Sequence, residues 1–444
     1  MKEKNESQKI GMVSLGCPKN TVDTELVLGD LLKEGFEVTA DEADADVIIV
    51  NTCGFIESAK RESIDMILEM AHYKSRGKCS RLVVTGCLSE RYSKELLKEI
   101  PEIDLVLGVN QYPELKSLLI KSNNGDNRFQ NSKSYYESYG QRALTTPFYS
   151  AYLKLGEGCS FQCAFCCIPH IRGAFRSRPL EAIVNETRQL VFRGVREFNL
   201  VSQVTNLYGS DLKMKDGIVR LLEALCEVDG ADWLRLLYCY PSFVDDRLLS
   251  VVAQNEKVCN YIDVPLQHVH QDMLKAMKRP EDEKDVRGMV ERAREICPGI
   301  ALRTTFIVGF PGETDAHFRK LADFLGEAEF DHVGIFEFSD EEGVQAHHYP
   351  DKIPADVAEE RRDALMEIQR NISQTKNERR VGKTTPVLVE GLDEDSMLMT
   401  GRGPFQAPEI DGQIIIEESE VEPGQIVSMK VTRSMEYDLI ARVE

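Results

Sequence analysis

Short apolar runs alternate with amphipathic segments along about the first 120 residues of the chain. The runs IGMVSLG, ADVIIVNTCG, SRLVVTGC and DLVLGV have the length and the Val and Ile content of buried strands. The segments between them, beginning with TVDTELVLGDLLKEG, place apolar residues at helical spacing. Because strands that alternate with helices form parallel sheets, we expect an N-terminal open parallel α/β sheet over residues 1–121.

A polar stretch without periodicity, residues 122–146, is predicted to be a linker. Beyond it, residues 147–374 repeat the strand–helix pattern about six times, with strands such as AYLKLGEG, EFNLVSQ and IALRTTFIVGF. This repeat predicts a central partial (βα)6 barrel, whose site would lie at the carboxyl ends of its strands.

The pattern changes again over residues 375–444, where five short strands are separated by turns. These strands predict a small five-stranded, OB-like β barrel, so the chain as a whole is expected to be an α/β protein of three domains. The segment has eight Lys or Arg against fourteen Asp or Glu. Small β barrels often bind RNA, but this one has the wrong charge for a phosphate backbone.

The composition is that of a globular protein, with 42% apolar and 29% charged residues. No apolar run reaches the roughly 20 residues that cross a bilayer, and the first residues, MKEKNESQKIGM, contain no apolar signal segment. We therefore expect a cytoplasmic protein without membrane contact. The net charge of −20 disfavours salt-driven binding to nucleic acid and fits a basic partner.

Three of the twelve cysteines follow predicted strands of the N-terminal sheet. Cys17 follows VSLG, Cys53 follows VIIVNT and Cys87 follows LVVTG, and we call these three the N-terminal triad. Since the carboxyl ends of parallel strands meet at one edge of a sheet, the three thiols are expected to lie together. Any one of them could be an ordinary core thiol. Three at equivalent strand ends favour a metal site.

A second thiol group follows the first predicted barrel strand. Cys159, Cys163 and Cys166, the loop triad, have the spacing C-x3-C-x2-C. Structural zinc sites close with four Cys or His ligands, usually in C-x2-C pairs, and Cys167 or His170 is too near Cys166 in sequence to complete a strain-free tetrahedron easily. A 4Fe–4S cluster held by three thiolates instead leaves one iron for a small molecule.

Phe165 completes a C-x3-C-x-aromatic-C motif, and its side chain could pack on a flat ring of that molecule. This motif at the mouth of a barrel resembles the radical S-adenosylmethionine (SAM) superfamily. The resemblance implies that the open iron binds SAM and that reductive cleavage gives a 5′-deoxyadenosyl radical. It also implies an external electron donor of the flavodoxin or ferredoxin type.

The three predicted domains together resemble the methylthiotransferases, and within these the enzymes that modify an aspartate β-carbon of small-subunit ribosomal protein 12. Matching stretches span residues 14–412 and include SLGCPKNTVDTE, NTCGFIESAKRESID, DVPLQH, LRTTFIVGFPGET and GRGPFQAPEIDG. The resemblance implies a transferase with two 4Fe–4S clusters, SAM and a C-terminal TRAM domain, and with ribosomal protein 12 as its partner.

The resemblance also assigns roles by position. The N-terminal triad would hold an auxiliary cluster, and the loop triad would hold the cluster that cleaves SAM. LRTTFIVGFPGET resembles the strand along which the adenine of SAM lies, which makes Ile307 and Gly309 candidates for backbone contacts. Gln203, Gln267 and Arg303 are candidate SAM-facing groups, or else satisfied polar groups that close the barrel. No catalytic side chain is assigned.

The chain departs from this family at two positions. Val204 stands where an Asp usually follows the Gln at the end of the second barrel strand, and a neighbour such as Asp211 could supply the carboxylate. Cys167 replaces a small or aliphatic residue and is expected to be a thiol that lies beside the loop.

Two alternative functions remain open from the sequence. A tRNA adenosine methylthiotransferase would have the same architecture, but a basic C-terminal barrel is expected for it, so tRNA is a disfavoured partner. A non-catalytic iron–sulfur or zinc protein that binds RNA or carries electrons would need no strand resembling an adenine site.

Overall fold

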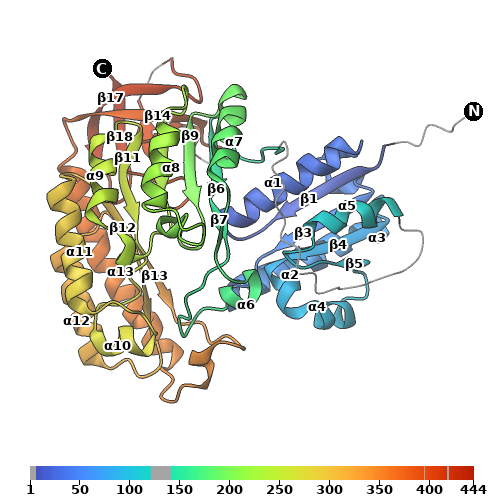
Figure 1. Ribbon diagram of the computed structural model, residues 1–444, viewed down its shortest axis with the longest axis horizontal. Helices are drawn as coiled ribbons and strands as arrows, with labels where there is room; N and C mark the ends of the chain where they lie inside the picture. The colour runs from blue at the N-terminus through green and yellow to red at the C-terminus, as the bar shows by residue number, and fades with distance from the viewer. Residues whose placement is uncertain (1–6, 122–141, 395, 418–419) are drawn as a thin grey trace, which may run out of the picture.

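The computed structural model describes residues 7–121, 142–394, 396–417 and 420–444. Its strands form two parallel sheets and a closed barrel, together with a two-stranded sheet. In Figure 1 the N-terminal domain, in blue and cyan, lies beside the central domain, in green to orange. The C-terminal barrel, in red, lies at one end of the central domain.

The N-terminal sheet has five parallel strands in the order β2-β1-β3-β4-β5. Its strands are β1 (Lys9–Ser14), β2 (Glu37–Thr39), β3 (Val47–Thr52), β4 (Arg81–Gly86) and β5 (Leu105–Val106). The sequence predicted this open parallel sheet but only four of its strands. The strand it missed, β2, is an edge strand of three residues, too short and too exposed to carry a hydrophobic pattern. The connecting helices are α1 (Pro18–Lys33), α2 (Glu57–Ala71), α3 (Tyr73–Arg76), α4 (Cys87–Glu99) and α5 (Tyr112–Lys121).

The central sheet has six parallel strands in the order β13-β12-β11-β10-β9-β6. They are β6 (Ser150–Lys154), β9 (Glu197–Val201), β10 (Trp233–Leu236), β11 (Val258–Asp263), β12 (Ala301–Val308) and β13 (His332–Glu337). Because β6 and β13 are its two edges, the sheet is a partial barrel, as predicted. Between β6 and β9 lie the paired β7 (Gly156–Glu157) and β8 (Arg176–Ser177), with α6 (Ile168–Arg172) between them.

Helices cover the outer face of the central sheet (Figure 1). These are α7 (Leu180–Phe192), α8 (Gly217–Cys226), α9 (Asp246–Gln254), α11 (Glu283–Ile296), α12 (Asp315–Ala328) and α13 (Ala355–Glu378), while the short α10 (Gln271–Ala276) lies at one end. The main apolar core fills the space between this sheet and its helices. None of the helices within the described ranges has the length and apolarity to cross a bilayer.

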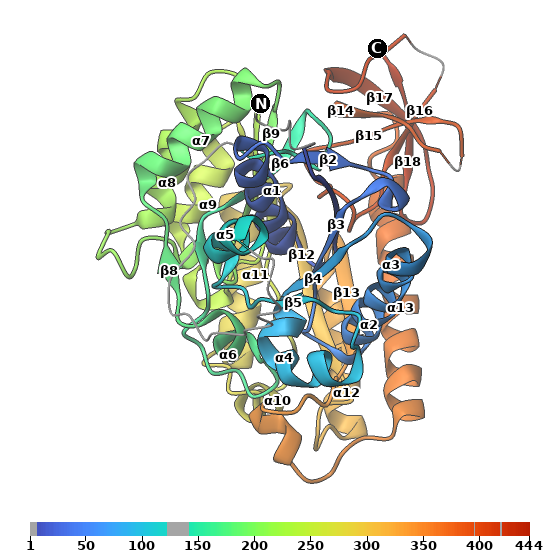
Figure 2. The same cartoon turned by 90° about the vertical axis from the view of Figure 1, so that its right-hand side faces the viewer.

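Five strands close the C-terminal barrel in the order β14-β15-β16-β18-β17, which confirms the predicted small β barrel. They are β14 (Thr384–Leu392), β15 (Met399–Arg402), β16 (Ile414–Ile416), β17 (Ile426–Ser434) and β18 (Leu439–Val443). Figure 2 shows this barrel at the end of α13, which leads into it.

The N-terminal and central domains share an apolar core. It joins Val83 and Leu105 of the N-terminal sheet to Ala164 of the loop after β7, to Ile171 of α6 and to Phe310 after β12. The loop that carries the loop triad is therefore packed between two domains rather than projecting from one.

Residues 122–141 of the predicted linker lie outside the described residues. Its last residues are anchored, because the buried Arg142 forms ion pairs with Glu25 of α1 and Glu186 of α7. Arg142 also donates a 2.8 Å hydrogen bond to the Tyr152 carbonyl. This arginine thus connects both domains, while the domain limits at residues 121, 147 and 374 stay predictions.

Candidate active site

The N-terminal triad lies at the carboxyl edge of the N-terminal sheet. Cys17 is the N-cap of α1, Cys53 follows β3 and Cys87 begins α4 directly after β4. Because β1, β3 and β4 are neighbours in the sheet, these strand ends bring the three residues together. The strand-end argument from the sequence therefore placed them correctly. Their role as ligands stays a prediction.

Glycines allow the three segments to approach closely. A Cβ added to Gly16 would lie 2.9 Å from the Sγ of Cys53. One added to Gly54 would lie 2.6 Å from the Cα of Leu88 and 2.9 Å from the carbonyl carbon of Cys87. Only glycine fits at these two positions, and it allows the segments that carry the thiols to pack closely.

The thiols of this triad are held in a low-dielectric site. Burial raises the pKa of Cys87 to about 12, with Arg172 opposing the shift and Cys17 and Cys53 adding to it. Burial also raises the pKa of Cys53, and Cys17 adds to that shift. Binding of a metal centre would therefore displace protons from these sulfurs, which is how buried thiols act as ligands.

The loop triad lies on the turn between β7 and α6. The Cys159 N–H donates to the Gly173 carbonyl at 3.0 Å, and the Cys166 N–H donates to the Cys163 carbonyl at 3.1 Å. Burial raises the pKa of Cys166, and the charges of Cys163, Cys167 and Cys159 add to it, in that order. The three thiols are thus close enough to interact electrostatically.

Arg172, at the end of α6, joins the two triads, and sequence reasoning missed it. It is 2% exposed. Its Nη2 lies 3.4 Å from the Sγ of Cys87 and also bonds the Oδ1 of Asn20. Its Nη1 donates to Asp23 at 2.8 Å and to Glu157 at 3.0 Å. The loop triad therefore carries, six residues beyond Cys166, a cation that touches the N-terminal triad.

A balanced charge network surrounds this arginine. Lys154 pairs with Asp23 and, at 2.9 Å, with Glu157, so two cations face two carboxylates. Burial by itself would raise the pKa of Glu157. Arg172 and Lys154 stabilise the carboxylate more strongly, so the pKa lies well below its usual range. Glu157 therefore stays charged in the interior.

Gln203, a predicted SAM contact, lies beside this network. Its Nε2 donates to Glu157 at 2.9 Å. Its Oε1 is buried, and no hydrogen-bond donor reaches it from the described residues. A buried acceptor without a donor is costly, so this oxygen is suited to a donor such as the amino group of SAM. Three clustered thiols beside such an acceptor fit a 4Fe–4S cluster with SAM on its open iron.

The backbone groups of Ile307 and Gly309, predicted to contact SAM, already have hydrogen-bond partners in the protein. The N–H groups of Ile307 and Gly309 already donate, to the Gln267 carbonyl at 2.8 Å and to Glu313 at 2.6 Å. Gln267 has a φ of 70°, in the left-handed region. A SAM contact of Ile307 or Gly309 through its N–H would require breaking one of these bonds, so these assignments stay predictions.

Arg303 and Phe165, two further predicted SAM contacts, are engaged with protein groups. Arg303 pairs with Asp263 at 3.1 Å and with Asp411 of the C-terminal barrel at 3.3 Å. Phe165 packs against the core shared by the two domains, together with Ile307. Their role as SAM contacts stays a prediction. The observed contacts join the central domain to the C-terminal barrel and to the N-terminal domain.

The two departures from the family pattern have local explanations. Val204 is 2% exposed and packs with Cys159 and Tyr240 in a small apolar cluster. Asp211 accepts bonds from the N–H and hydroxyl of Ser177, so the carboxylate beside Gln203 is that of Glu157, not of Asp211.

The thiol of Cys167 contacts the N-terminal domain. Its Sγ lies 3.6 Å from the Phe55 carbonyl and 3.8 Å from the Nη1 of Arg91. Burial raises its pKa to about 11. It is a thiol beside the loop, as the sequence predicted.

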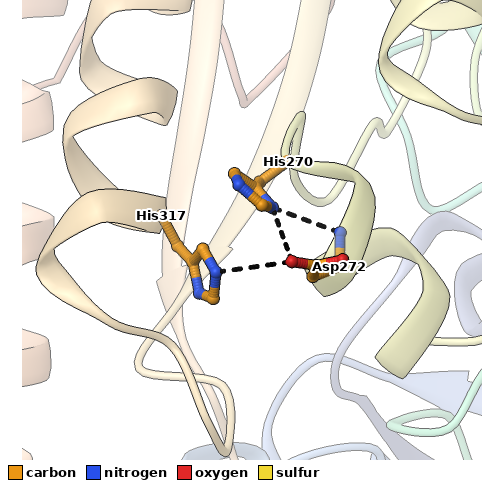
Figure 3. Close-up of side chains that lie close together, drawn as sticks. All are labelled: His270, Asp272 and His317. Atoms are coloured by element: carbon orange, nitrogen blue, oxygen red, sulfur yellow. Dashed lines mark hydrogen bonds and ion pairs between the residues drawn. The ribbon is translucent and has the colours of Figure 1, made fainter.

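His270, Asp272 and His317 form a cluster with metal-ligand chemistry at the N-termini of α10 and α12 (Figure 3). The Nδ1 of His270 accepts the Asp272 N–H, and the Nδ1 of His317 accepts the Thr314 N–H, so each ring caps a helix. A histidine that binds a metal through Nε2 carries its proton on Nδ1, where it donates. Two helix N-termini also disfavour a cation. We assign this cluster to helix capping.

A cavity of about 420 Å³ lies between β6 and the C-terminal barrel. Its lining includes four carboxylates and one arginine, namely Glu390, Glu409, Asp411, Asp438 and Arg402. The face where the two domains meet is therefore acidic.

Family models match three parts of the chain. They are the uncharacterized protein family UPF0004 over residues 9–108, the radical SAM superfamily over residues 153–325 and the TRAM domain over residues 381–443.

Relatives named ribosomal protein uS12 methylthiotransferase RimO match nearly the whole chain, and two of them illustrate the match. The protein of Desulforamulus reducens is 47% identical, covering 98% of this chain and 99% of the relative. The protein of Trichlorobacter lovleyi is 46% identical, covering 98% of each.

Among solved structures, the radical SAM methyltransferase TsrM of Kitasatospora setae, with cobalamin and a 4Fe–4S cluster bound, resembles the fold with a TM-score of 0.57. The match covers 86% of this chain and 81% of TsrM at 15% identity. At that identity the likeness concerns the fold alone.

Proposed function

The chain belongs to the RimO family of radical SAM methylthiotransferases, and we propose that it transfers a methylthio group to the β-carbon of an aspartate in small-subunit ribosomal protein 12. It is an enzyme that uses SAM and two 4Fe–4S clusters. The two cysteine triads, one at the carboxyl edge of the N-terminal sheet and one in the loop after β7, carry the proposed chemistry. The observation that carries the substrate is the 47% identity, over nearly the whole chain, to a ribosomal protein uS12 methylthiotransferase RimO.

The residues present support a division of labour between the triads. When bound, the cluster at the loop triad would supply the electron that cleaves SAM, and the cluster at the N-terminal triad would supply the sulfur that is transferred. Gln203 would accept a hydrogen bond from SAM, held in place by Glu157. Phe161 stacks on Tyr240 with ring centroids 4.2 Å apart, and this pair packs beside Cys159, where it shields that thiol from water.

The partners are inferred from charge. Ribosomal protein 12 is expected to be basic, as proteins that bind ribosomal RNA are, and the acidic cavity at the C-terminal barrel would attract it. The same charge disfavours tRNA. We further propose a cytoplasmic location and a flavodoxin- or ferredoxin-type electron donor.

The substrate is tested by mass spectrometry of ribosomal protein 12 from cells with and without the gene, complemented by the wild type or by Cys17→Ala. We expect the methylthio mass on one aspartate peptide to appear only with the wild-type gene. An unchanged ribosomal protein 12, together with loss of a methylthio nucleoside from tRNA, would transfer the assignment to the tRNA enzymes.

A further inference from the structure

Lys19 is a buried lysine that forms no ion pair with a carboxylate of the described residues. It is the second residue of α1, two positions after Cys17, and is 7% exposed. Its Nζ lies 3.4 Å from the ring centroid of Tyr238, a cation–π contact. Lysine is rarely buried in this way unless an anion compensates its charge.

The carboxylates near Lys19 are already engaged. Lys19 interacts electrostatically with Cys17 most strongly, and then, against the opposing charge of Arg172, with the carboxylates of Glu157 and Asp263. Glu157, however, is paired with Arg172 and Lys154, and Asp263 with Arg303 at 3.1 Å. Neither is therefore the missing partner.

A second feature at the same place also calls for an anion. α1 begins at this point with no side-chain cap on Cys17 and no acidic residue in its first turn. The positive end of a 16-residue helix therefore adds to the charge of the lysine.

Tyr238, whose ring contacts the ammonium of Lys19, has a strained backbone conformation. Tyr238, just after β10, has a φ of 58°, and its N–H donates to Asp263 at 2.9 Å. A non-glycine residue in the left-handed region persists only when its surroundings hold it there, and such residues cluster at functional sites. The ring over which the ammonium lies is thus fixed at the carboxyl end of a central strand, facing the N-terminal triad.

We propose that Lys19 binds the side-chain carboxylate of the substrate aspartate. In aspartate the carboxylate is bonded directly to the β-carbon, so an ammonium that holds the carboxylate also fixes the carbon that is modified. Lys19 would place that carbon next to Cys17, at the site to which the proposed function assigns sulfur transfer. This inference rests on that proposed function.

The test compares ribosomal protein 12 carrying the target aspartate, located by mass spectrometry, with the same protein carrying asparagine there. Binding to the cluster-loaded enzyme is measured by fluorescence anisotropy without reductant. We expect the wild type to bind the aspartate form at least about tenfold more tightly, as for a charged hydrogen bond. In Lys19→Gln the preference should fall to about twofold or less, and Lys19→Arg should keep most of it.

Lys33→Gln is the matched control, because Lys33 lies at the other end of α1, with its side chain 44% exposed. It should keep the wild-type preference. The carboxylate assignment is overturned if the wild type shows no preference, or if Lys19→Gln retains it. It is also overturned if Lys19→Gln loses the preference only together with iron, since Lys19 would then serve the cluster. Absence of any methylthiolation by the wild type would instead remove the proposed function.

Discussion

Arg172, on α6 directly after the loop triad in the sequence, reaches Cys87 of the N-terminal triad with its guanidinium. Arginine suits this position because its planar fork can meet several acceptors at once, here Asp23, Glu157, Asn20 and the sulfur of Cys87. The charge of Arg172 opposes the rise in the pKa of Cys87. One side chain therefore both holds two domains together and stabilises a thiolate.

Replacing Arg172 by Gln should destabilise the protein by roughly 3–5 kcal/mol, because two buried carboxylates would be left with a single cation. Thermal unfolding of the purified protein measures the effect. Arg61→Gln is the control, since Arg61 is 76% exposed and should change the unfolding temperature little. Equal unfolding temperatures for both variants would show that the Arg172 network is not needed for stability.

The cysteine triads predict the metal content of the enzyme. Reconstituted wild type should bind about eight irons, and Cys17→Ala and Cys159→Ala should each lose about half, as two four-iron clusters require. Cys226→Ala, on α8, should lose none. Iron and zinc analysis provides the measurement, and wild type that binds zinc in place of iron would contradict the cluster assignment.

The three N-terminal strand ends converge because glycines precede or follow the cysteines. This part of the site was predictable, since strand patterns fix the ends of β1, β3 and β4 and the cysteines come directly after them. The short edge strand β2 was not predictable, because three exposed residues carry no periodic signal.

Gly54→Ala should lower the unfolding temperature and reduce iron at the N-terminal triad, because the new Cβ would meet the backbone of Leu88 at 2.6 Å. Gly326→Ala is the control. Gly326 lies in α12 with nothing within 4 Å of its added Cβ, so this change should stabilise by about 0.5–1 kcal/mol. Unfolding and iron content should be compared for both. Full iron content in Gly54→Ala would show that the backbone around the N-terminal triad can shift to accept the new Cβ.

The whole molecule is joined by buried ion networks between its domains. Glu197 of β9 is fully buried and accepts bonds from Arg402 of β15 at 2.7 and 3.0 Å and from Arg235 of β10 at 3.1 Å. Despite burial, Arg402 and Arg235 hold the pKa of Glu197 well below its ordinary value of 4.5. The C-terminal barrel is thus fixed to the central sheet by charge.

This pKa has a consequence for acid stability. Because the folded-state value is depressed, the contribution of Glu197 is fully present above pH 4.5 and is lost as the pH falls below that value. Glu197→Gln should therefore unfold at a lower temperature at pH 7 and lose less stability between pH 5 and pH 3 than the wild type does. Glu390→Gln, at a carboxylate 27% exposed, should behave nearly as wild type. Parallel acid profiles for Glu197→Gln and wild type would exclude this role.

The sequence alone determined the longer elements and the cysteines, because both depend on short-range information: strand and helix periodicity, and the spacing of thiols along one loop or after successive strands. Only the tertiary structure decided which distant residues meet. Arg172 reaches Cys87 across 85 positions, and Lys19, just after Cys17, lies on Tyr238 of the predicted strand WLRLLYC, 219 positions away in the sequence. Contacts of that separation are set by how sheets and helices pack, and no local pattern encodes them.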